Sequence, residues 1–183
     1  MSTDPATRTL LLGIARGAIT AAVRGEAAAP PGDAPILHEE RGAFVTLMHM
    51  QRLRGCIGRV VPDSPLSIML PEVAVLAATE DPRFARVSPL ELDALHIEIS
   101  LLTVPALLAD ASLIEIGRHG LMVTLGVRRG LLLPQVATEY AWSAEEFLAE
   151  TCRKAMLPID AWKRDGATVH TFETEIIEED ATR

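Results

Sequence analysis

A thiol lies between two glycines in the hexapeptide Leu53-Arg54-Gly55-Cys56-Ile57-Gly58, the stretch of this chain best suited to chemistry. Glycine lets another group approach the main chain closely. A neighbouring cation favours the thiolate, which is the form of cysteine that attacks electrophiles and binds metals. Arg54 supplies such a cation two residues before Cys56. The spacing therefore predicts a reactive site at Cys56, where Arg54 either favours the thiolate or holds an anionic substrate.

Two alternatives to this prediction stay open. A free cysteine is often only a small buried hydrophobic side chain. Gly55 and Gly58 inside a strand also suggest a β-bulge or a close backbone approach, and a bulge would separate the side chains of Arg54 and Cys56.

An imidazole is the natural partner for a nucleophilic thiol. His119 lies in Gly117-Arg118-His119-Gly120, where the glycines free the chain to aim the ring. A nucleophile and base pair of Cys56 and His119 would need the fold to join residues that are far apart in the sequence. An exposed histidine in a glycine-rich bend is the simpler interpretation.

Two further polar residues are candidates for binding. Glu98 lies in the middle of an expected strand, where it is either solvated or lines a cleft as a ligand or a partner of Arg54. Gln135 follows the apolar run 131–134 and either caps a strand end or orients a ligand. Asp81 and Arg83 flank Pro82, and we expect a local salt bridge that fixes this turn.

The motifs predict neither a metal nor a cofactor. The chain contains no zinc-type Cys/His spacing, no Walker loop and no dinucleotide fingerprint. Cys56, His119 and Glu98 together would suit a metal ion, but they are three distant single residues. Cys152 lies on the apolar face of an expected helix and is assigned to the core.

Composition and charge exclude several classes of protein. Of the 183 residues, 49% are hydrophobic and 23% charged, which is typical of a globular chain with one domain or two small lobes. The net charge of -8, without a basic run, argues against nucleic-acid binding. Two cysteines make no disulfide framework. The N-terminus does not resemble a signal peptide, and no apolar run suits a membrane span. We expect a cytoplasmic protein that binds no nucleic acid and no membrane.

Hydrophobic periodicity and capping residues predict the elements that position these side chains. Asp4 and Pro5 begin a helix. Asp63 or Ser64 caps a second helix that Pro71 kinks or divides, and Ser88 with Glu91 forms a capping box. The other expected elements are a hairpin of 43–48 and 53–61, a strand 96–102, a helix 110–116 ended by Gly117, a hairpin of 120–125 and 130–133, a helix capped by Ser143, and a strand 168–177. Neighbouring hairpins favour an α+β fold with an antiparallel sheet flanked by helices.

These residues together resemble a known family. The hexapeptide 53–58 is the most specific marker, and it is followed in order by Asp81-Pro82-Arg83-Phe84, Ile97-Glu98-Ile99-Ser100, Gly117-Arg118-His119-Gly120, residues 131–136 and Cys152-Arg153-Lys154-Ala155. The pattern resembles the AmmeMemoRadiSam system protein A family, also called the AMME syndrome candidate gene region domain. The resemblance covers roughly residues 6–175, within a single AMME-type domain of residues 1–183 that ends in an acidic tail, 178–183.

The resemblance implies two unequal lobes with a cleft between them. It implies a cleft position for Arg54, Cys56 and His119, with Glu98 and Gln135 as neighbours. It also implies a functional association with a Memo-like protein and a radical S-adenosylmethionine protein, and an unbroken helix where Pro71 lies. The family has no firmly assigned reaction. Thiol-dependent catalysis at Cys56 and a non-catalytic module that binds a small molecule or a partner therefore both stay open.

Overall fold

The chain forms two compact units of unequal size. The computed structural model describes residues 3–179. Residues up to 102 and from 175 onward form unit 1, and residues 103–174 form unit 2. Both units combine helices with antiparallel strands, which confirms the predicted α+β class. Strand β7 (Ala167–Glu178) contributes residues to both units.

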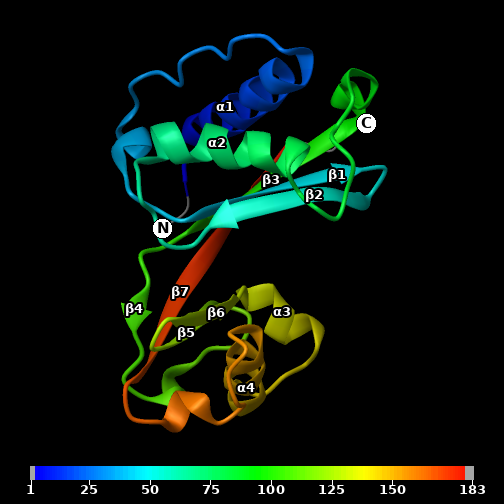
Figure 1. Cartoon of the computed structure of the whole chain (residues 1–183). Coiled ribbons are helices and arrows are strands. Elements are labelled where there is room, and N and C mark those ends of the chain that lie inside the picture. Colours follow the sequence, from blue (N-terminus) through cyan, green and yellow to red (C-terminus); the bar gives the residue numbers. More distant parts are fainter. Residues whose placement is uncertain (1–2, 180–183) are drawn as a thin grey trace. The chain divides into compact units, whose positions relative to one another are not determined.

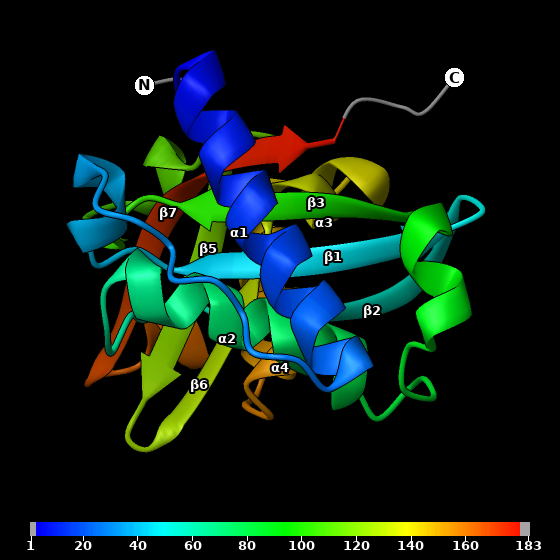
Figure 2. The same ribbon diagram turned by 90° about the horizontal axis from the view of Figure 1, so that it is seen from above.

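Unit 1 is an antiparallel sheet with two helices on one face. Its strands β1 (Ala43–His49), β2 (Arg52–Arg59) and β3 (Leu95–Leu102) lie in the order β2-β1-β3, so β2 is an edge strand. Helices α1 (Pro5–Arg24) and α2 (Leu66–Thr79) lie on the same side of this sheet (Figures 1 and 2). Short 3-10 helices span Pro35–His38 and Pro89–Ala94.

Alternation along the strands decides which side chains meet the helices. Val45 and Leu47 of β1 and Ile97 and Ile99 of β3 are fully buried in the core of unit 1, against α1 and α2. The residues between them, such as Thr46 and Glu98, point to the opposite face because successive side chains of a strand alternate. We call this second surface the helix-free face of unit 1.

Helix α1 confirms the predicted start at Asp4, whose carboxylate accepts the N–H groups of Ala6 and Thr7. By length and composition alone, α1 also passes as a possible membrane span. Its Leu11, Ala15 and Ile19, however, are fully buried in the core of unit 1. One face of α1 thus packs into the core of unit 1.

Helix α2 corrects two predictions. It is one continuous helix, so Pro71 neither divides it nor replaces it with two short helices. The buried α2 side chains on both sides of Pro71, including Met69, Leu70 and Val73, hold the helix together although proline removes one hydrogen bond. Neither Asp63 nor Ser64 caps α2. The N-cap is Pro65, whose carbonyl accepts the N–H groups of Ile68 and Met69.

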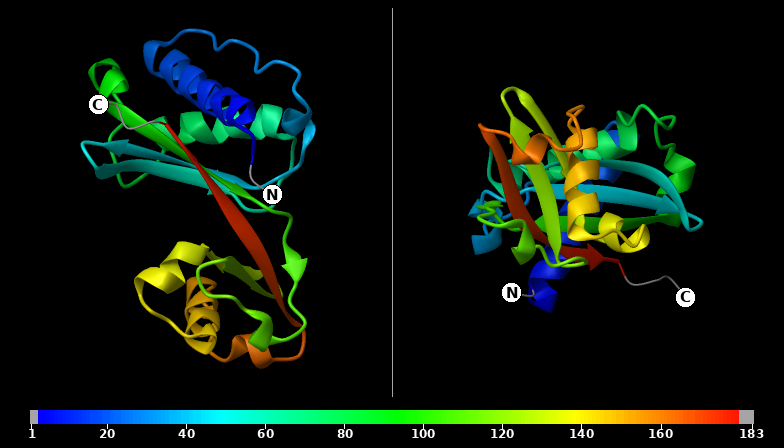
Figure 3. Two further views of the ribbon diagram at one scale, coloured as in Figure 1. Left: turned by 180° about the vertical axis from the view of Figure 1, so that it is seen from behind. Right: turned by 90° about the horizontal axis from the view of Figure 1, so that it is seen from below.

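Unit 2 contains the second predicted hairpin, β5 (His119–Leu125) and β6 (Arg128–Leu132), in the strand order β7-β5-β6. The two-residue strand β4 (Ala106–Leu107) pairs with β7. Helix α4 (Ala144–Lys154) packs against β5 and β6 (Figure 3) and buries Phe147, Leu148 and Cys152. The predicted capping box of Ser143 and Glu146 is confirmed, as is the core position of Cys152.

Other details of unit 2 and the C-terminal end differ from the expectations. The expected helix 110–116 is only a 3-10 turn, Ala111–Leu113, because Ile114 alone is buried and no apolar stripe continues. The short helix α3 (Pro134–Glu139) was not expected. Of the expected acidic tail, Glu178 ends β7 and Glu179 pairs with Arg16, whereas residues 180–183 lie outside the described residues.

Candidate functional site

Three polar side chains form a row across the helix-free face of unit 1. Thr46 of β1 lies opposite Cys56 of β2 on one side and opposite Glu98 of β3 on the other. Residues that are directly opposite in an antiparallel sheet place their side chains on the same face. The sheet register therefore brings together a thiol, a hydroxyl and a carboxyl group from three different strands.

The thiol of Cys56 is half-buried and accepts a hydrogen bond. The hydroxyl Oγ1 of Thr46 donates to Cys56 Sγ at 3.3 Å. Such a donor stabilises negative charge on sulfur. Cys56 is thus not one of the buried residues that form the apolar core of unit 1.

A turn that begins 25 residues after Cys56 holds the main chain of this residue at the edge of the sheet through two hydrogen bonds. Its N–H donates to Asp81 Oδ2 at 2.9 Å, and its carbonyl accepts from Arg83 Nη2 at 3.2 Å. The side chains of Arg83 and Asp81 are joined by two further bonds, Nε to Oδ1 at 2.9 Å and Nη2 to Oδ2 at 2.7 Å. We call Asp81 and Arg83 the edge clip. The predicted local salt bridge is confirmed, and it also fixes the position of Cys56.

Asp81 and Arg83 shift each other's pKa in opposite directions. The hydrogen bonds from Arg83 hold the pKa of Asp81 far below its ordinary value, against the opposing effect of burial, and the N–H of Cys56 adds to this. The pKa of Arg83 is raised, first by its bond to Asp81, while burial opposes this and a charge on Cys56 contributes further. The Asp81 side chain is only 2% exposed, whereas that of Arg83 is 53% exposed.

Arg54 is engaged elsewhere. Its Nε donates to Glu91 Oε1 at 2.7 Å, and its Nη1 and Nη2 donate to the carbonyls of Ala85 and Arg86. The pairing register explains this orientation: Leu47 lies opposite Gly55 and Met48 opposite Leu53, so Arg54 is the extra residue of a β-bulge. The cation with a hydrogen bond to Cys56 is Arg83.

The side chain of Glu98 makes no hydrogen bond or ion pair with any residue between 3 and 179. Burial raises its pKa above the ordinary value, and the charge of Glu178 adds to this, while His96 opposes it. A carboxyl group in this state retains its proton to a higher pH than a solvated one.

Both glycines of the hexapeptide lie where a side chain does not fit. A Cβ atom on Gly55 would lie 2.1 Å from the carbonyl oxygen of Ala77 in α2. A Cβ atom on Gly58 would lie 2.4 Å from the carbonyl oxygen of Ala43 and 2.4 Å from the ring of Phe44. Gly55 thus lets α2 pack tightly behind Cys56, and Gly58 leaves room for Phe44.

The two remaining candidates belong to unit 2. His119 begins β5, and its Nδ1 accepts the main-chain N–H of Glu115 at 3.1 Å, so a neutral His119 carries its proton on Nε2. Gln135 is exposed in the first turn of α3 and does not cap a strand end. The pairing of Cys56 with His119 joins residues of different units and stays a prediction.

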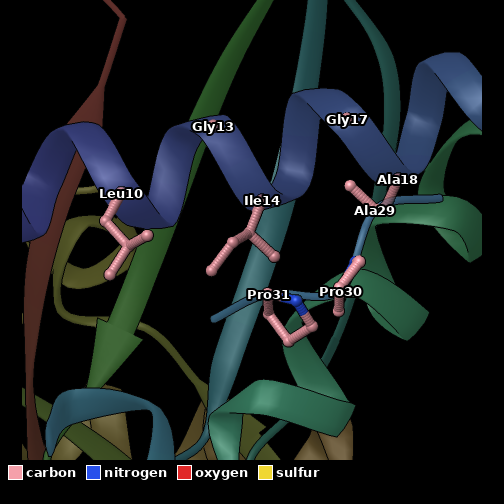
Figure 4. A pocket seen from close by; sticks show the side chains of 8 residues that line it. All are labelled: Leu10, Gly13, Ile14, Gly17, Ala18, Ala29, Pro30 and Pro31. Atoms are coloured by element: carbon pink, nitrogen blue, oxygen red, sulfur yellow. The ribbon is translucent and has the colours of Figure 1, made fainter. Parts of the chain in front are cut away.

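The described residues contain no group of three or more His, Cys, Asp or Glu side chains that could hold a metal ion. An apolar hollow of unit 1, about 250 Å³, lies between α1 and the loop 29–31 (Figure 4). Leu10, Ile14 and Pro31 point into it, and no charged side chain lines it. This hollow lacks groups for chemistry, so the row of Cys56, Thr46 and Glu98 is the better candidate.

A sequence model of the AMMECR1 family matches residues 12–177, which includes the hexapeptide and the edge clip. The chain belongs to the AMMECR1 family. An archaeal relative from Methanothermobacter thermautotrophicus is 48% identical over 178 residues and covers 93% of each chain. Protein TK0174 from Thermococcus kodakarensis is 43% identical and covers 94% of this chain and 90% of its own.

The fold of this AMMECR1 chain matches a solved structure. The crystal structure of the uncharacterized protein PH0010 from Pyrococcus horikoshii superimposes with a TM-score of 0.83 at 43% identity, over 93% of this chain and 90% of that one. The names of these relatives give no reaction, so any function must be argued from the side chains.

Sequence reasoning missed Thr46 and gave Arg83 too small a role. The strand pattern alone placed Thr46 on β1 but did not give its partner on β2. The close spacing of Asp81 and Arg83 indicated their salt bridge, but their contacts with Cys56 span 25 and 27 residues and depend on the packing of the turn against β2. In this AMMECR1 chain the site therefore depends both on the pairing register of β1 with β2 and on the turn that contains Asp81 and Arg83.

Proposed function

We propose that Cys56 is the nucleophile of a thiol-dependent enzyme and that the helix-free face of unit 1 carries its site. One observation supports this most: a half-buried thiol accepts a hydroxyl hydrogen bond from Thr46 while Asp81 and Arg83 hold its main chain at both the N–H and the carbonyl. A cysteine needed only for packing gains nothing from such positioning. Nucleophiles of covalent catalysis gain a fixed direction of attack from it.

The reaction that fits these groups is transfer of an electrophilic carbon to sulfur. The thiol of Cys56 loses its proton to solvent, and the thiolate forms an S–C bond as the bond to the leaving group breaks. Thr46 stabilises the thiolate before the attack. Glu98, whose pKa is raised, gives its proton to the leaving group and becomes the carboxylate.

The rate of alkylation tests this proposal. The rate at which iodoacetamide labels Cys56 at neutral pH is compared with that of N-acetylcysteine amide, with the Cys56 peptide separated from the Cys152 peptide by mass spectrometry. We expect Cys56 to react faster than this free thiol. A rate at or below that of the free thiol contradicts the nucleophile. Labelling of a His119→Ala variant tests in the same assay whether this imidazole contributes.

The second candidate is a binding module without chemistry. It is favoured by Glu98 having no partner among the described residues, since a carboxyl group on a sheet face can orient a ligand without a reaction. A Cys56→Ser variant separates the two functions in a cell-based assay. Full function in that variant excludes covalent catalysis, whereas intact binding with lost turnover excludes a pure binding role.

We further propose that this chain acts as an AmmeMemoRadiSam system protein A, together with a Memo-like protein and a radical S-adenosylmethionine protein. The resemblance of the hexapeptide and the later motifs supports this, and the two free cysteines and the net charge of -8 suit a cytoplasmic partner. Affinity capture of the tagged chain from its own cells, with both proteins identified by mass spectrometry, tests it. Their absence from the captured material contradicts the association.

A further inference from the structure

The guanidinium of Arg83 keeps one nitrogen for a ligand. Nε and Nη2 are used by Asp81, and Nη2 also reaches the carbonyl of Cys56 at 3.2 Å. Nη1 makes no hydrogen bond with any residue from 3 to 179. The side chain is 53% exposed, and the bond from Nη2 places its guanidinium at the carbonyl of Cys56.

The other charges near Cys56 leave Arg83 as the group that can recognise an anion. The guanidinium of Arg54 is used by Glu91 and two carbonyls. Asp81 is almost completely buried behind Arg83 and is hydrogen-bonded to it. Glu98 would repel an anion when ionised, but burial raises its pKa and so reduces this repulsion. A rigidly held guanidinium with free donors is the group that proteins use for carboxylates and phosphates.

We propose that the substrate of the Cys56 site is an anionic electrophile, a small molecule whose carboxylate pairs with Nη1 of Arg83 while its reactive carbon meets Cys56 Sγ. This inference rests on the proposed thiol chemistry and names the substrate class for it. Arg83 then has two tasks: Nη2 positions the main chain of Cys56, and Nη1 selects the charge of the substrate.

Two alkylating reagents test this directly. Iodoacetate and iodoacetamide both form an S–C bond with the thiolate while the C–I bond breaks and iodide leaves, with the thiol proton released to solvent. They differ only in carrying a carboxylate or a neutral amide. The measured quantity is the rate of iodoacetate labelling at Cys56 divided by the rate of iodoacetamide labelling, in low salt and from the Cys56 peptide. This ratio reports selection by charge, because the exposure of the thiol affects both rates equally.

We expect this ratio to exceed that of N-acetylcysteine amide, and Arg83→Gln to lower it about fivefold, the effect of one exposed ion pair. Added salt should lower the ratio in the unmodified protein. Arg86→Gln is the matched control, since it removes the same charge from an exposed side chain without a hydrogen bond or ion pair in residues 3–179. Its ratio should equal that of the unmodified protein.

The outcomes separate the two proposals. A ratio equal to that of the free thiol, unchanged in Arg83→Gln, overturns the anionic substrate even if iodoacetamide labels Cys56 faster than the free thiol. Iodoacetamide labelling no faster than that of the free thiol instead overturns the thiol chemistry itself. An equal loss of ratio in Arg83→Gln and Arg86→Gln assigns the effect to net charge and also overturns the role of Arg83.

Discussion

The main-chain N–H of Cys56 donates a hydrogen bond of 2.9 Å to Oδ2 of Asp81, a carboxylate that is itself almost completely buried. The bond joins the edge strand of unit 1 to the turn after α2. Because Asp81 also binds Arg83 through both oxygens, one carboxylate holds the position of the candidate nucleophile and of the neighbouring cation.

Replacing Asp81 with Ala should destabilise the protein by about 2 kcal/mol, because the N–H of Cys56 and the guanidinium of Arg83 lose their partner. Urea denaturation followed by circular dichroism measures this. Asp63→Ala is the control, since Asp63 is exposed and pairs only at the surface, with Arg59, and should cost less than about 1 kcal/mol. Equal costs for the two variants would show that the edge clip adds no stability.

Acid should weaken unit 1 through Glu91. Hydrogen bonds from Arg54 lower its pKa from 4.5 to about 2, although burial opposes the shift. Because the folded value is depressed, the pair contributes fully above about pH 4.5, and the contribution is lost as the pH falls toward 2. The free energy of unfolding measured over this window should fall less steeply in Glu91→Gln than in the unmodified protein.

The pKa of Glu98 is shifted in the opposite direction to that of Glu91, so its effect on stability should also be opposite. Its pKa is raised in the folded protein, so its ionisation costs stability as the pH rises through that value. Glu98→Gln should therefore be more stable relative to the unmodified protein at neutral pH than at pH 4. A constant difference across this range would show that Glu98 is solvated like an ordinary carboxylate.

Replacing Gly55 and Gly17 of unit 1 with alanine should change the stability of the protein in opposite directions. Gly55→Ala should cost about 3 kcal/mol, because the new Cβ would overlap the backbone oxygen of Ala77. Gly17→Ala in α1 should stabilise by about 0.7 kcal/mol, since no atom lies within 4 Å of its Cβ and alanine favours helix. Thermal unfolding of both variants checks the pair, and a tolerated Gly55→Ala would contradict the tight packing of α2 behind Cys56.

The hydroxyl of Thr46 should affect the reactivity of the thiol without affecting its exposure. Thr46→Val keeps the shape but removes the donor to Sγ, so iodoacetamide should label Cys56 about twofold more slowly at neutral pH. Thr46→Ser retains the hydroxyl and should keep the rate of the unmodified protein. Equal rates in all three proteins would mean that the hydrogen bond does not act on the thiolate.

Local signals predicted the elements well. Asp4 marked the start of α1, two capping boxes were located correctly, and alternation along 96–102 placed Glu98 on the face away from Ile97 and Ile99. Where the prediction failed, in the division of a helix at Pro71 and in the helix expected at 110–116, packing decided the outcome. The buried face of α2 outweighs the cost of proline, and a single buried Ile114 is too little to sustain a helix.

The site itself depended on a detail that the sequence does not show. In a regular hairpin with His49 opposite Arg52, Thr46 would lie opposite Gly55. The bulge at Arg54 shifts the register by one residue, so that Thr46 meets Cys56 instead and Arg54 turns to Glu91. Sequence reasoning anticipated that glycine could separate Arg54 from Cys56, but not which residues would replace Arg54 beside the thiol.

The edge clip also has a consequence for self-association. An edge strand with free N–H and carbonyl groups can template pairing with another chain, which leads to aggregation. At Cys56 both groups are already occupied by Asp81 and Arg83, so a foreign strand finds no partners there. The turn that positions the candidate nucleophile thus also prevents strand pairing with another chain at Cys56. Loss of Asp81 would free the N–H of Cys56 for such pairing.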